Sequence, residues 1–584
     1  MKRFLIALAC LLTTPALAQW QTPNHSVPVG RGAGVTGFGN AAPGTAGRPI
    51  VSNGPSADPS FQQLPNTGLV PGAANTFKGS LNGTTTSDIA LVSCSLAYQL
   101  TQWATGTGWQ CGILPVLPSR AVAATLNLSA FSVVRTLGYA TPGDGGGAVF
   151  QKTSGQLLDT IVGTGTISNA GAGYTNGTYT YVPLTGSATG ITTYAKVTVA
   201  GTVVTAVTLL DVNGRGAASL VGDVLTTANT NIGGTGTGFA YTVTAMSTAL
   251  ASFTDTGTNR FQYVIDGGQS VDPRAFGCKF DWVGVDATST ENGPCLQAAL
   301  NFASITRYVR QDLGGTLAGT RVVLPAGSAK FCQPLVLPGA TQLFGQGPFN
   351  SVLKACDSGI STAAHLLTMC DPNAEVACFG VQAGQFGINS FNATGLSGAF
   401  AIFSNAAQQS RWLDNISIYS GTRGCIKYAK GWGGAANASV YDIFCTINTG
   451  APNDGIQIAS DVGTTLVNLR NTIVESGGAG FAGIGINVLG GQVSLDGYHF
   501  EGVATGVNVN QTVATYSTTI MHLTGGSGCS NAVVLQATNT PGNFAIYDCV
   551  KQGACTNLVS NGQPAGANRA ADARPKDGWV FFNP

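Results

Sequence analysis

Four stretches in the C-terminal half of the chain decide the fold: LDNISIYS (413–420), YDIFCT (441–446), LRNTIVES (469–476) and LDGYHFEG (495–502). When these stretches are stacked, four residues share one position of the repeat at steps of 27, 29 and 26 residues: Ile418, Cys445, Val474 and Phe500. A period in the twenties, made of short strands and glycine turns, indicates that each repeat is one coil of a solenoid.

A second strand follows each of these stretches at a similar offset, in GIQI (455–458), GIGI (483–486) and GVNV (506–509), and two more coils appear in TTIMHLTG (518–525) and FAIYDCV (544–550). Because side chains alternate across a strand, one set of residues is expected to point inward: Ile416, Ile418, Ile443, Cys445, Val474, Tyr498 and Phe500. The fold predicted is all-β, a right-handed parallel β-helix. The segment 292–311, with Leu296, Leu300 and Ile305 at helical spacing, is expected to be a helix that caps its open end.

The composition supports short strands and excludes two classes of partner. Of 584 residues, 81 are glycine, and this abundance of glycine disfavours long helices. Only 9% are charged and the formal net charge is +1, so electrostatics predict neither nucleic-acid binding nor attachment to an anionic membrane.

The N-terminal segment MKRFLIALACLLTTPALAQ (1–19) has the features of a secretory signal peptide. Lys2 and Arg3 precede an apolar run, and cleavage is expected after Ala18. Cys10 lies inside the apolar run, where the alternative of a lipoprotein signal has less support. No later stretch is long and apolar enough to cross a bilayer, so a secreted or cell-surface location is predicted, with the periplasm as the alternative.

Fourteen cysteines occur, thirteen of them after residue 18. Export favours disulfides, and spacing suggests four pairs without fixing the connectivity: Cys94 with Cys111, Cys370 with Cys378, Cys425 with Cys445, and Cys529 with Cys549. The odd number leaves at least one thiol unpaired. No cysteine or histidine spacing fits zinc, and the sequence predicts no metal site and no cofactor.

Shifts in composition divide the chain into eight segments. We expect a signal peptide (1–18), a Gly/Pro-rich stalk (19–74), a small cysteine-containing module (75–113), a lead-in to the β-helix (114–162), an inserted antiparallel β module (163–246), the continued lead-in (247–275), the right-handed parallel β-helix (276–562) and a C-terminal tail (563–584).

Residues 274–347 resemble the start of the pectate-lyase-like β-helix superfamily. The matching positions are Phe276-Gly277, Asp281, Gln297-Ala298-Ala299, Pro325-Ala326-Gly327 and Gly345-Gln346-Gly347. KFDWVG (279–284) replaces the family's tight GDG turn. The superfamily includes lyases, hydrolases and binding proteins without catalysis, so the resemblance implies a fold more than an activity.

The front half is similar to phage and prophage tail-fibre and tailspike proteins, in SNGPSADPSF (52–61), NTFKGSLNGTTTS (75–87) and GYATPGDGGGAVF (138–150). This resemblance implies a homotrimer that contacts a surface polysaccharide. Together with the signal peptide, it favours an exported bacterial protein of prophage descent over a virion component.

Glu475 and Glu501 occupy the same position of the repeat, with His499 two residues from Glu501. Adjacent coils stack about 4.8 Å apart, so the two carboxylates are expected at a separation that suits a retaining glycosidase. These three residues are the candidate catalytic set. The alternative is that they are polar residues on the outside of the wall, and this reading is favoured because the outward positions of any solenoid need polar side chains.

Other polar motifs are weaker. Asp454 and Asp461 in PNDGIQIASD (452–461) resemble the NTDG motif of polygalacturonases, whose other motifs are missing, so Asp454 is expected in a turn. Arg470 falls opposite Asp496, which predicts an ion pair between coils. His522 has no aligned partner in this register and is expected to be structural.

Exposed aromatic side chains can stack on sugar rings. The candidates are Trp412, Tyr419 and Phe444, together with Trp432; the same aromatics are equally consistent with subunit contacts. Three functions therefore remain open: a polysaccharide-binding protein, a polysaccharide depolymerase acting as hydrolase or lyase, and a structural or adhesive appendage.

Overall fold

The computed structural model describes residues 115–584 apart from gaps at 187–191, 211–215, 218, 266–269, 307, 311–315, 319, 358–359, 361–364, 371–377, 394–395, 397, 405–406, 409, 421–422, 430–436, 448–453, 460–465, 477–482, 512–516, 526–528, 536–542, 548–549, 552–555, 562–569, 575–578 and 584. Before residue 115 it describes only the backbone of short strands. The predicted signal peptide, most of the stalk and the Cys94 site lie outside the described residues.

The chain separates into two compact units, residues 1–114 and 115–584. In the first unit, four antiparallel hairpins follow one another: β1 (Val27–Gly30) with β2 (Phe38–Ala41), β3 (Ile50–Val51) with β4 (Ser60–Phe61), β5 (Thr76–Gly79) with β6 (Ser87–Ala90), and β7 (Gln99–Ala104) with β8 (Gly108–Ile113).

The second unit opens with a five-stranded sheet around the short helix α1 (Arg120–Ala124). Its strands, in spatial order, are β18 (Phe253–Thr254), β19 (Arg260–Val264), β11 (Val149–Thr153), β10 (Val133–Thr136) and β9 (Val116–Leu117). The ring of Phe150 packs edge-on against Phe253 and Tyr263, at centroid distances of 5.1 and 6.3 Å. The chain leaves this sheet after β11 and returns to it at β18.

Between those two points lies a six-stranded antiparallel sheet. Its spatial order is β12 (Val162–Ala172), β17 (Thr237–Met246), β16 (Val224–Thr226), β13 (Gly177–Gly186), β14 (Thr193–Ala200) and β15 (Val203–Leu209). The alternating residues of β14 are buried and half-buried in turn, and the buried set joins a separate apolar cluster that includes Val197, Leu225 and Tyr241.

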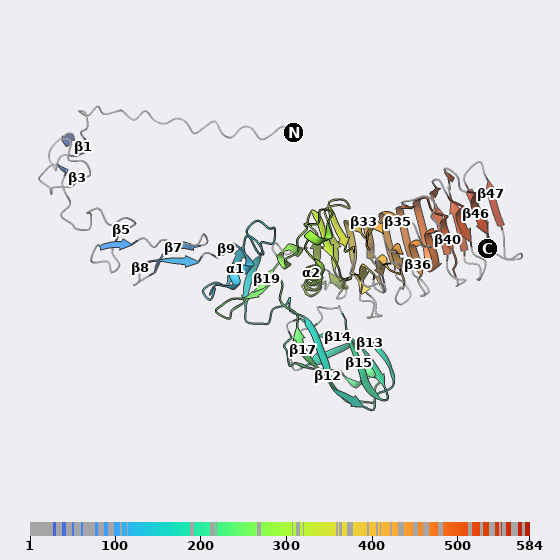
Figure 1. Ribbon diagram of the computed structural model, residues 1–584, viewed down its shortest axis with the longest axis horizontal. Helices are drawn as coiled ribbons and strands as arrows, with labels where there is room; N and C mark the ends of the chain where they lie inside the picture. The colour runs from blue at the N-terminus through green and yellow to red at the C-terminus, as the bar shows by residue number, and fades with distance from the viewer. Residues whose placement is uncertain are drawn as a thin grey trace. The chain divides into compact units, whose positions relative to one another are not determined.

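The rest of the unit is a right-handed parallel β-helix (Figure 1), whose first strand lies before α2 (Gly293–Ile305) along the chain and whose other strands follow it. The longer of its two sheets contains β20 (Ser270–Val271), β23 (Arg321–Val323), β26 (Gln342–Phe344), β30 (Gln382–Asn389), β33 (Ser410–Ser420), β35 (Asn437–Ile447), β37 (Leu466–Ser476), β39 (Gln492–Glu501), β41 (Ser517–Met521) and β44 (Asn543–Tyr547), all paired in parallel. Four short strands join it: β24 (Gly327–Phe331), β27 (Ser351–Ala355), β42 (Thr524–Gly525) and β45 (Val550–Lys551).

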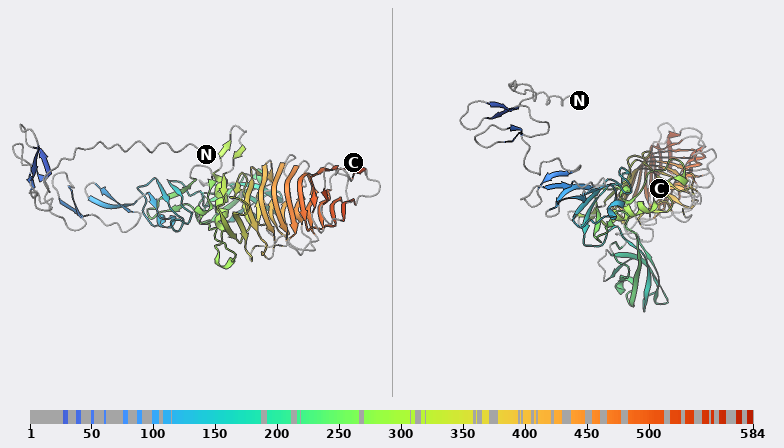
Figure 2. Two further views of the ribbon diagram at one scale, coloured as in Figure 1. Left: turned by 90° about the horizontal axis from the view of Figure 1, so that it is seen from above. Right: turned by 60° about the vertical axis from the view of Figure 1, so that its left-hand side comes forward.

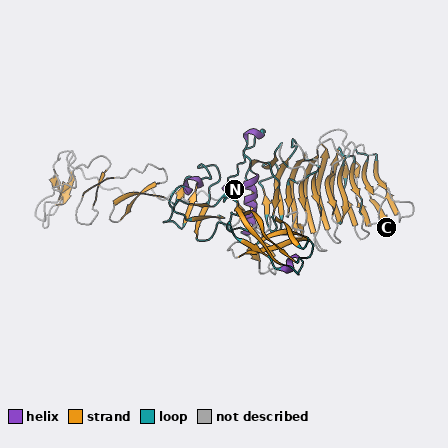
Figure 3. Cartoon of the chain, turned by 60° about the horizontal axis from the view of Figure 1, so that its bottom comes forward, coloured by secondary structure: helices purple, strands orange, loops and turns teal. Residues whose placement is uncertain are grey.

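The second sheet has nine parallel strands, β25 (Leu335–Leu337), β28 (Leu367–Met369), β31 (Phe400–Ser404), β34 (Gly424–Tyr428), β36 (Asp454–Ala459), β38 (Ile484–Gly490), β40 (Thr505–Val509), β43 (Asn531–Leu535) and β46 (Asn557–Asn561). Figures 2 and 3 show the stacked strands from three further directions. At the C-terminal end, β48 (Trp579–Asn583) pairs antiparallel to β44, and β47 (Ala570–Arg574) pairs antiparallel to β48.

In six successive coils of the longer sheet, one residue has a positive φ and divides the strand into two faces. These residues are Gln385, Asn415, Asp442, Asn471, Gly497 and His522, and the pairing on either side of them places them at one level of the repeat. Asn415 Nδ2 donates to Gln385 Oε1 at 2.9 Å, and Asn471 Nδ2 donates to Asp442 Oδ1 at 3.0 Å. We call the stretches before this corner the first face, those after it the second face, and the nine-stranded sheet the third face.

The register predicted for the core is confirmed. Ile418 pairs with Cys445, Cys445 with Val474, and Val474 with Phe500. All seven residues predicted to point inward are no more than 1% exposed.

One register was wrong by two residues. Ile456 pairs with Ile486, not with Ile484, so Gly485 rather than Gly483 stands beside Gly455. The cause is the inward side chain of Tyr498: its hydroxyl would lie 2.0 Å from a Cβ at residue 485, so this position needs glycine.

The predicted helix also ends earlier than expected. It stops at Ile305, and Tyr308–Arg310 forms β21, paired with β22 (Thr316–Ala318). Leu296 and Leu300 are buried as predicted. The helix lies at the first coil of the third face, where Gln297 Nε2 donates to Val336 O at 2.9 Å and Val336 N donates to Gln297 Oε1 at 2.8 Å. These two bonds satisfy backbone groups of the edge strand β25, which is what a cap must do.

Of the predicted disulfides, Cys425–Cys445 is present and links the third face to the second. Two pairs that spacing did not suggest are also present, Cys278–Cys295 and Cys332–Cys356. Cys370 and Cys529 are disulfide-bonded. The side chains of their expected partners, Cys378 and Cys549, and of Cys94 and Cys111 lie outside the described part of the chain.

Candidate functional site

The outward side chains of the second face form two rows that run along the solenoid. The outer row is Lys330, Lys354, Asn389, Tyr419, Thr446, Glu475 and Glu501, each in register with the next. The middle row beside it is Ser328, Val352, Gly387, Ser417, Phe444, Ile473, His499 and Thr524. Both candidate carboxylates, His499, Tyr419 and Phe444 therefore share one face.

The lysines at the start of the outer row are covered. Lys354 is 1% exposed; its Nζ donates to Asp357 Oδ1 at 2.6 Å and lies 5.5 Å from the ring centroid of Trp282. Lys330 Nζ donates to Asp286 O at 2.5 Å. The loop that carries Trp282 and Asp286 thus removes both cations from the surface, so the open part of the row begins at Asn389.

The middle of this face presents aromatic and apolar surface. The rings of Tyr419 and Phe444 lie 6.0 Å apart at 58°, on neighbouring coils. Ile473, the next residue of the middle row, is 37% exposed. Half-exposed aromatic rings beside polar groups are the surface on which the apolar faces of sugar rings pack.

The acidic pair lies at the far end of the same rows. Glu475 pairs with Glu501 on adjacent strands, about 4.8 Å apart in the stacking direction. Glu475 is half-buried, and its Oε1 accepts from Thr446 Oγ1 at 3.0 Å; Glu501 is exposed. His499 Nδ1 shares a hydrogen bond of 2.9 Å with Thr524 Oγ1, the next residue of the middle row, which restrains its ring within that row. The register thus places two carboxylates on adjacent strands, where they can accept hydrogen bonds from a sugar hydroxyl or an ammonium group.

The first face carries a separate charged group. Arg470 Nε lies 3.9 Å from Asp496 Oδ2, which confirms the predicted ion pair. His522 has no partner at its own level of the register, which is occupied by Gly497, but its Nδ1 lies 2.7 Å from Asp496 Oδ1. His522 stands at the corner, where its positive φ directs it back toward the preceding coil. The side chains of Arg470 and His522 are both more than half exposed. Their contacts with Asp496 are therefore surface ion pairs that contribute little to stability.

The third face holds a polar network that sequence analysis missed. Asp454 is the first residue of β36 and is 5% exposed. Its Oδ2 accepts from Gln457 Nε2 at 2.8 Å and Asn487 Nδ2 at 3.2 Å, and lies 3.6 Å from Arg423. Asn508 Nδ2 extends the chain of bonds to Asn487 Oδ1 at 2.9 Å. The sequence signal for this network was the polar residue between apolar ones in GIQI and GVNV. The network assigns Asp454 a structural role. Asp461 lies outside the described residues.

A second group beside the third face is centred on His365, whose imidazole is neutral at pH 7. The ring of His365 stacks on Phe403 at 3.9 Å, and its Nδ1 accepts from Phe400 N at 3.0 Å. Burial, with a contribution from the Lys427 ammonium, lowers the pKa of His365 to about 4. Burial and the nearby Arg423 also lower the pKa of Lys427, against the opposing effect of Asp454.

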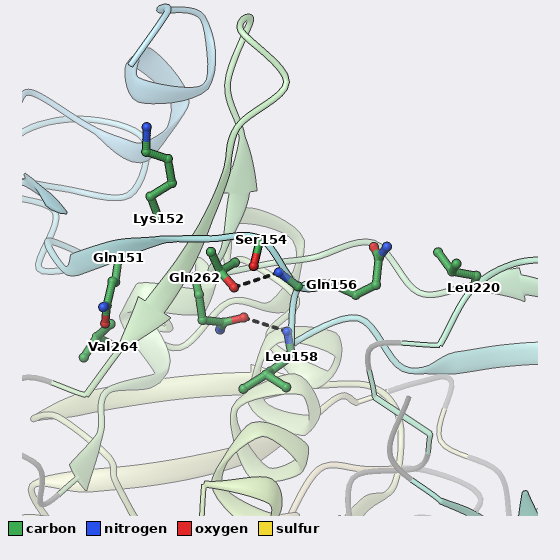
Figure 4. A pocket seen from close by; sticks show the side chains of 10 residues that line it. Gln151, Lys152, Ser154, Gln156, Leu158, Leu220, Gln262 and Val264 are labelled. Carbon is green, nitrogen blue, oxygen red and sulfur yellow. Dashed lines mark hydrogen bonds between the residues drawn. The ribbon is translucent and has the colours of Figure 1, made fainter. Parts of the chain in front are cut away.

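A pocket of about 770 Å³ lies near the five-stranded sheet, outside the solenoid (Figure 4). Its walls are mostly polar side chains of β11, β19 and the segment after β11, with Leu158, Leu220 and Val264 as apolar parts. Leu158 N donates to Gln262 Oε1 at 2.6 Å, and Gly155 N donates to Thr153 Oγ1 at 3.0 Å. Lys152 donates to Ser129 O. These bonds use several of its polar groups internally, and the pocket has neither an acid pair nor an aromatic platform.

A metal site can be tested only on the side chains that the structure describes. There, one group of candidate ligands converges, Glu291 with Cys332 and Cys356. The two cysteines are bonded to each other, so they offer no thiolate, and Glu291 Oε1 already accepts from Gly293 N and Cys332 N. This group fits a structural role. The side chains of two predicted sugar-stacking residues, Trp412 and Trp432, lie outside the described residues.

Comparison with known proteins adds the following. No family profile matches the sequence, and no curated protein does. Among solved structures, the tailspike protein gp49 of Acinetobacter baumannii bacteriophage Fri1, a capsular polysaccharide depolymerase, aligns over 76% of this chain and 69% of its own, at 11% identity and a TM-score of 0.36. Pantoea stewartii WceF, a glycan biofilm modifying enzyme, aligns over 54% of this chain and 41% of its own, at 11% identity and a TM-score of 0.33.

The active domain of tailspike protein 2 from bacteriophage CBA120 aligns over 53% of this chain and 45% of its own, at 12% identity and a TM-score of 0.29. The chain thus spans less than half the length of these last two proteins. Likeness at this level carries no conclusion about function, which has to come from the residues of this chain.

Proposed function

We propose that the second face binds a polysaccharide along the axis of the solenoid. The observation that carries this proposal is the continuity of the outer and middle rows, which place Tyr419 and Phe444 on the same face as Glu475, Glu501 and His499. An extended glycan needs such a repeating surface, in which aromatic rings pack on sugar faces and polar groups bind hydroxyls.

Binding of this kind favours neutral or amino sugars here. The open part of the rows carries two carboxylates, and the two lysines in register with them are covered. A glycan rich in carboxylates would meet like charge on this face.

A second candidate function, hydrolysis, rests on the register of Glu475 and Glu501. In this proposal one carboxyl acts as acid and the other as nucleophile, as in retaining glycosidases. Binding without cleavage is the stronger proposal, because Glu501 is exposed, whereas catalysis gains from excluding water.

The wider proposal is a secreted protein that acts as a homotrimer, as the resemblance to tailspikes implies; an adhesive appendage without catalysis is the alternative. Within the described residues no helix has the length and apolar character needed to cross a membrane. Light scattering on the purified protein tests the trimer, and a monomer at micromolar concentration would contradict it.

The binding proposal is tested by screening the protein on an array of neutral, amino and acidic polysaccharides. Tyr419→Ala and Phe444→Ala should each weaken binding of the best glycan at least tenfold. The matched control is Tyr441→Ala, which removes an aromatic residue from the first face and should leave binding unchanged. Equal binding by all three variants would overturn the proposal.

Cleavage is measured in the same samples by reducing ends and by the absorbance of unsaturated products. Loss of reducing-end formation in Glu475→Gln and Glu501→Gln, at unchanged melting temperature, would support the hydrolase. Unsaturated products would indicate a lyase, and neither signal would leave binding alone.

A further inference from the structure

A second cavity, of about 300 Å³, lies where the inserted antiparallel sheet joins the rest of the unit. It is formed by one side of α2 and by the two segments that lead into β12 and out of β17. The proposal that follows concerns this cavity alone and does not depend on the function proposed for the second face.

Asp159 is the charged residue of this lining. It is 6% exposed, and its Oδ2 accepts from Ala251 N at 2.9 Å and from Ser252 N at 2.8 Å. Its other oxygen, Oδ1, is buried and has no hydrogen-bond partner among the described residues. A buried carboxylate oxygen without a donor is costly, and a structure that keeps one usually has a ligand, an ion or water for it.

The described residues also supply no counter-charge to this carboxylate. The guanidinium of Arg120 binds the same segment from its carbonyl side, donating to Ala249 O at 2.9 Å, Ala251 O at 2.5 Å and Ser252 O at 2.7 Å. Its donors are thus directed at carbonyl groups and not at Asp159. A buried charge with hydrogen bonds from two amides still lacks the ion pair that normally accompanies burial.

The remainder of the cavity is mostly apolar. Leu158, Ile161, Leu250, Pro294 and Phe302 contribute hydrocarbon surface. Its volume is at the lower end of the range of small-molecule sites, which begins at about 300 Å³. One buried acceptor beside an apolar space is the arrangement that selects an amphipathic ligand with one donor group.

We propose that this cavity binds a small organic cation, a primary amine with a short apolar body. The ammonium group would lie beside the Asp159 carboxylate and neutralise it, while the alkyl part would pack on Leu158, Leu250 and Phe302. A neutral alcohol supplies the donor but not the charge, and an organic anion of the same size is repelled.

The position of the site predicts a mechanical effect. Because the cavity has walls from α2 and from both connections of the inserted sheet, an occupant holds these segments together. Binding should therefore slow proteolysis at the two connections and raise the melting temperature.

The test uses the full-length protein and n-butylamine, with 1-butanol and butyrate as neutral and anionic analogues of matched size. Calorimetric titration at pH 7 should show that the amine binds at least tenfold more tightly than either analogue. Asp159→Asn keeps an oxygen to accept from Ala251 N and Ser252 N but removes the charge, and should abolish the preference for the amine. Ala298→Leu fills the cavity from α2 and should abolish binding of all three probes.

Three results would overturn the proposal. These are equal binding of butylamine and butanol, unchanged amine binding in Asp159→Asn when circular dichroism shows a native fold, and no binding of any probe at millimolar concentration. The last result would mean that water alone occupies the cavity. If Asp159→Asn fails to fold, Ala298→Leu still tests whether the probes enter this cavity. Proteolysis of the wild-type protein with and without butylamine then tests whether the bound amine protects the two connections.

Discussion

Phe500 provides the sharpest test of the packing described here, because it lies next to an exposed candidate catalytic residue yet points the other way. It is 1% exposed, and its ring lies 5.8 Å from that of Tyr498. Truncating this ring removes on the order of 150–200 Å² of buried apolar surface. At about 25 cal/mol per Å², this loss corresponds to about 4–5 kcal/mol. Phe500→Ala should therefore lower the free energy of unfolding by about 3–5 kcal/mol.

The neighbours of the ring predict a coupling that a simple loss of hydrophobicity would not produce. A Cβ at Gly506 would lie 2.5 Å from the ring, and a Cβ at Gly525 would also lie 2.5 Å from it. Gly506→Ala should therefore cost about 1–3 kcal/mol in the wild-type protein. In the Phe500→Ala background part of that cost should disappear, because the ring atoms are gone while Ala532 O, 2.6 Å from the same Cβ, remains; the difference is the coupling energy of a double-mutant cycle.

The measurement is equilibrium unfolding in urea, followed by circular dichroism, for the wild type, both single variants and the double variant. Phe500→Leu is the control that keeps most of the volume and should lose clearly less stability than Phe500→Ala. The reasoning is refuted if Phe500→Ala costs less than about 1 kcal/mol, or if Gly506→Ala costs the same in both backgrounds, since either result would mean that the ring does not fill the space between these strands.

Three further predictions concern other parts of the solenoid. Glu501→Gln should change the free energy of unfolding by no more than about 0.5 kcal/mol, since the side chain is exposed; a loss above 1 kcal/mol in urea unfolding would contradict its placement. Replacing both Cys425 and Cys445 with alanine should cost about 3 kcal/mol, as expected for a disulfide spanning 20 residues, and reductant should then no longer affect the unfolding midpoint through this pair. The pKa of His365 is about 4 in the folded chain, against about 6.5 when unfolded. The unfolded chain therefore takes up the proton first, so the contribution of the neutral ring is fully present above pH 6.5 and is lost as the pH falls toward 4. Melting temperatures of the wild type should drop more steeply over this window than those of His365→Asn, and parallel curves would show that the ring is not buried in its neutral form.

Much of the solenoid could be predicted from the chain because its determinants are local and repeat. The alternation of apolar side chains assigns Ile418, Cys445 and Val474 to the core, and the steps between them set the register of neighbouring coils. The same register brings Glu475 beside Glu501. The prediction was wrong at GIGI (483–486), where two glycines fit the pattern equally well and only the inward hydroxyl of Tyr498, from another face, selects Gly485.

What the sequence by itself determined is therefore the repeat, the inward residues and the candidate face, since strand alternation and coil length are properties of short segments. The tertiary structure decided which outward residues remain accessible. Lys330 and Lys354 share the row of Glu475, but a loop that begins some 50 residues before Lys330 covers them both. It also decided that Cys278 pairs with Cys295, that Asp454 is buried in an amide network, and that Asp159 lines a cavity against α2. Each of these depends on contacts between segments distant along the chain, and no local periodicity encodes which segments meet there.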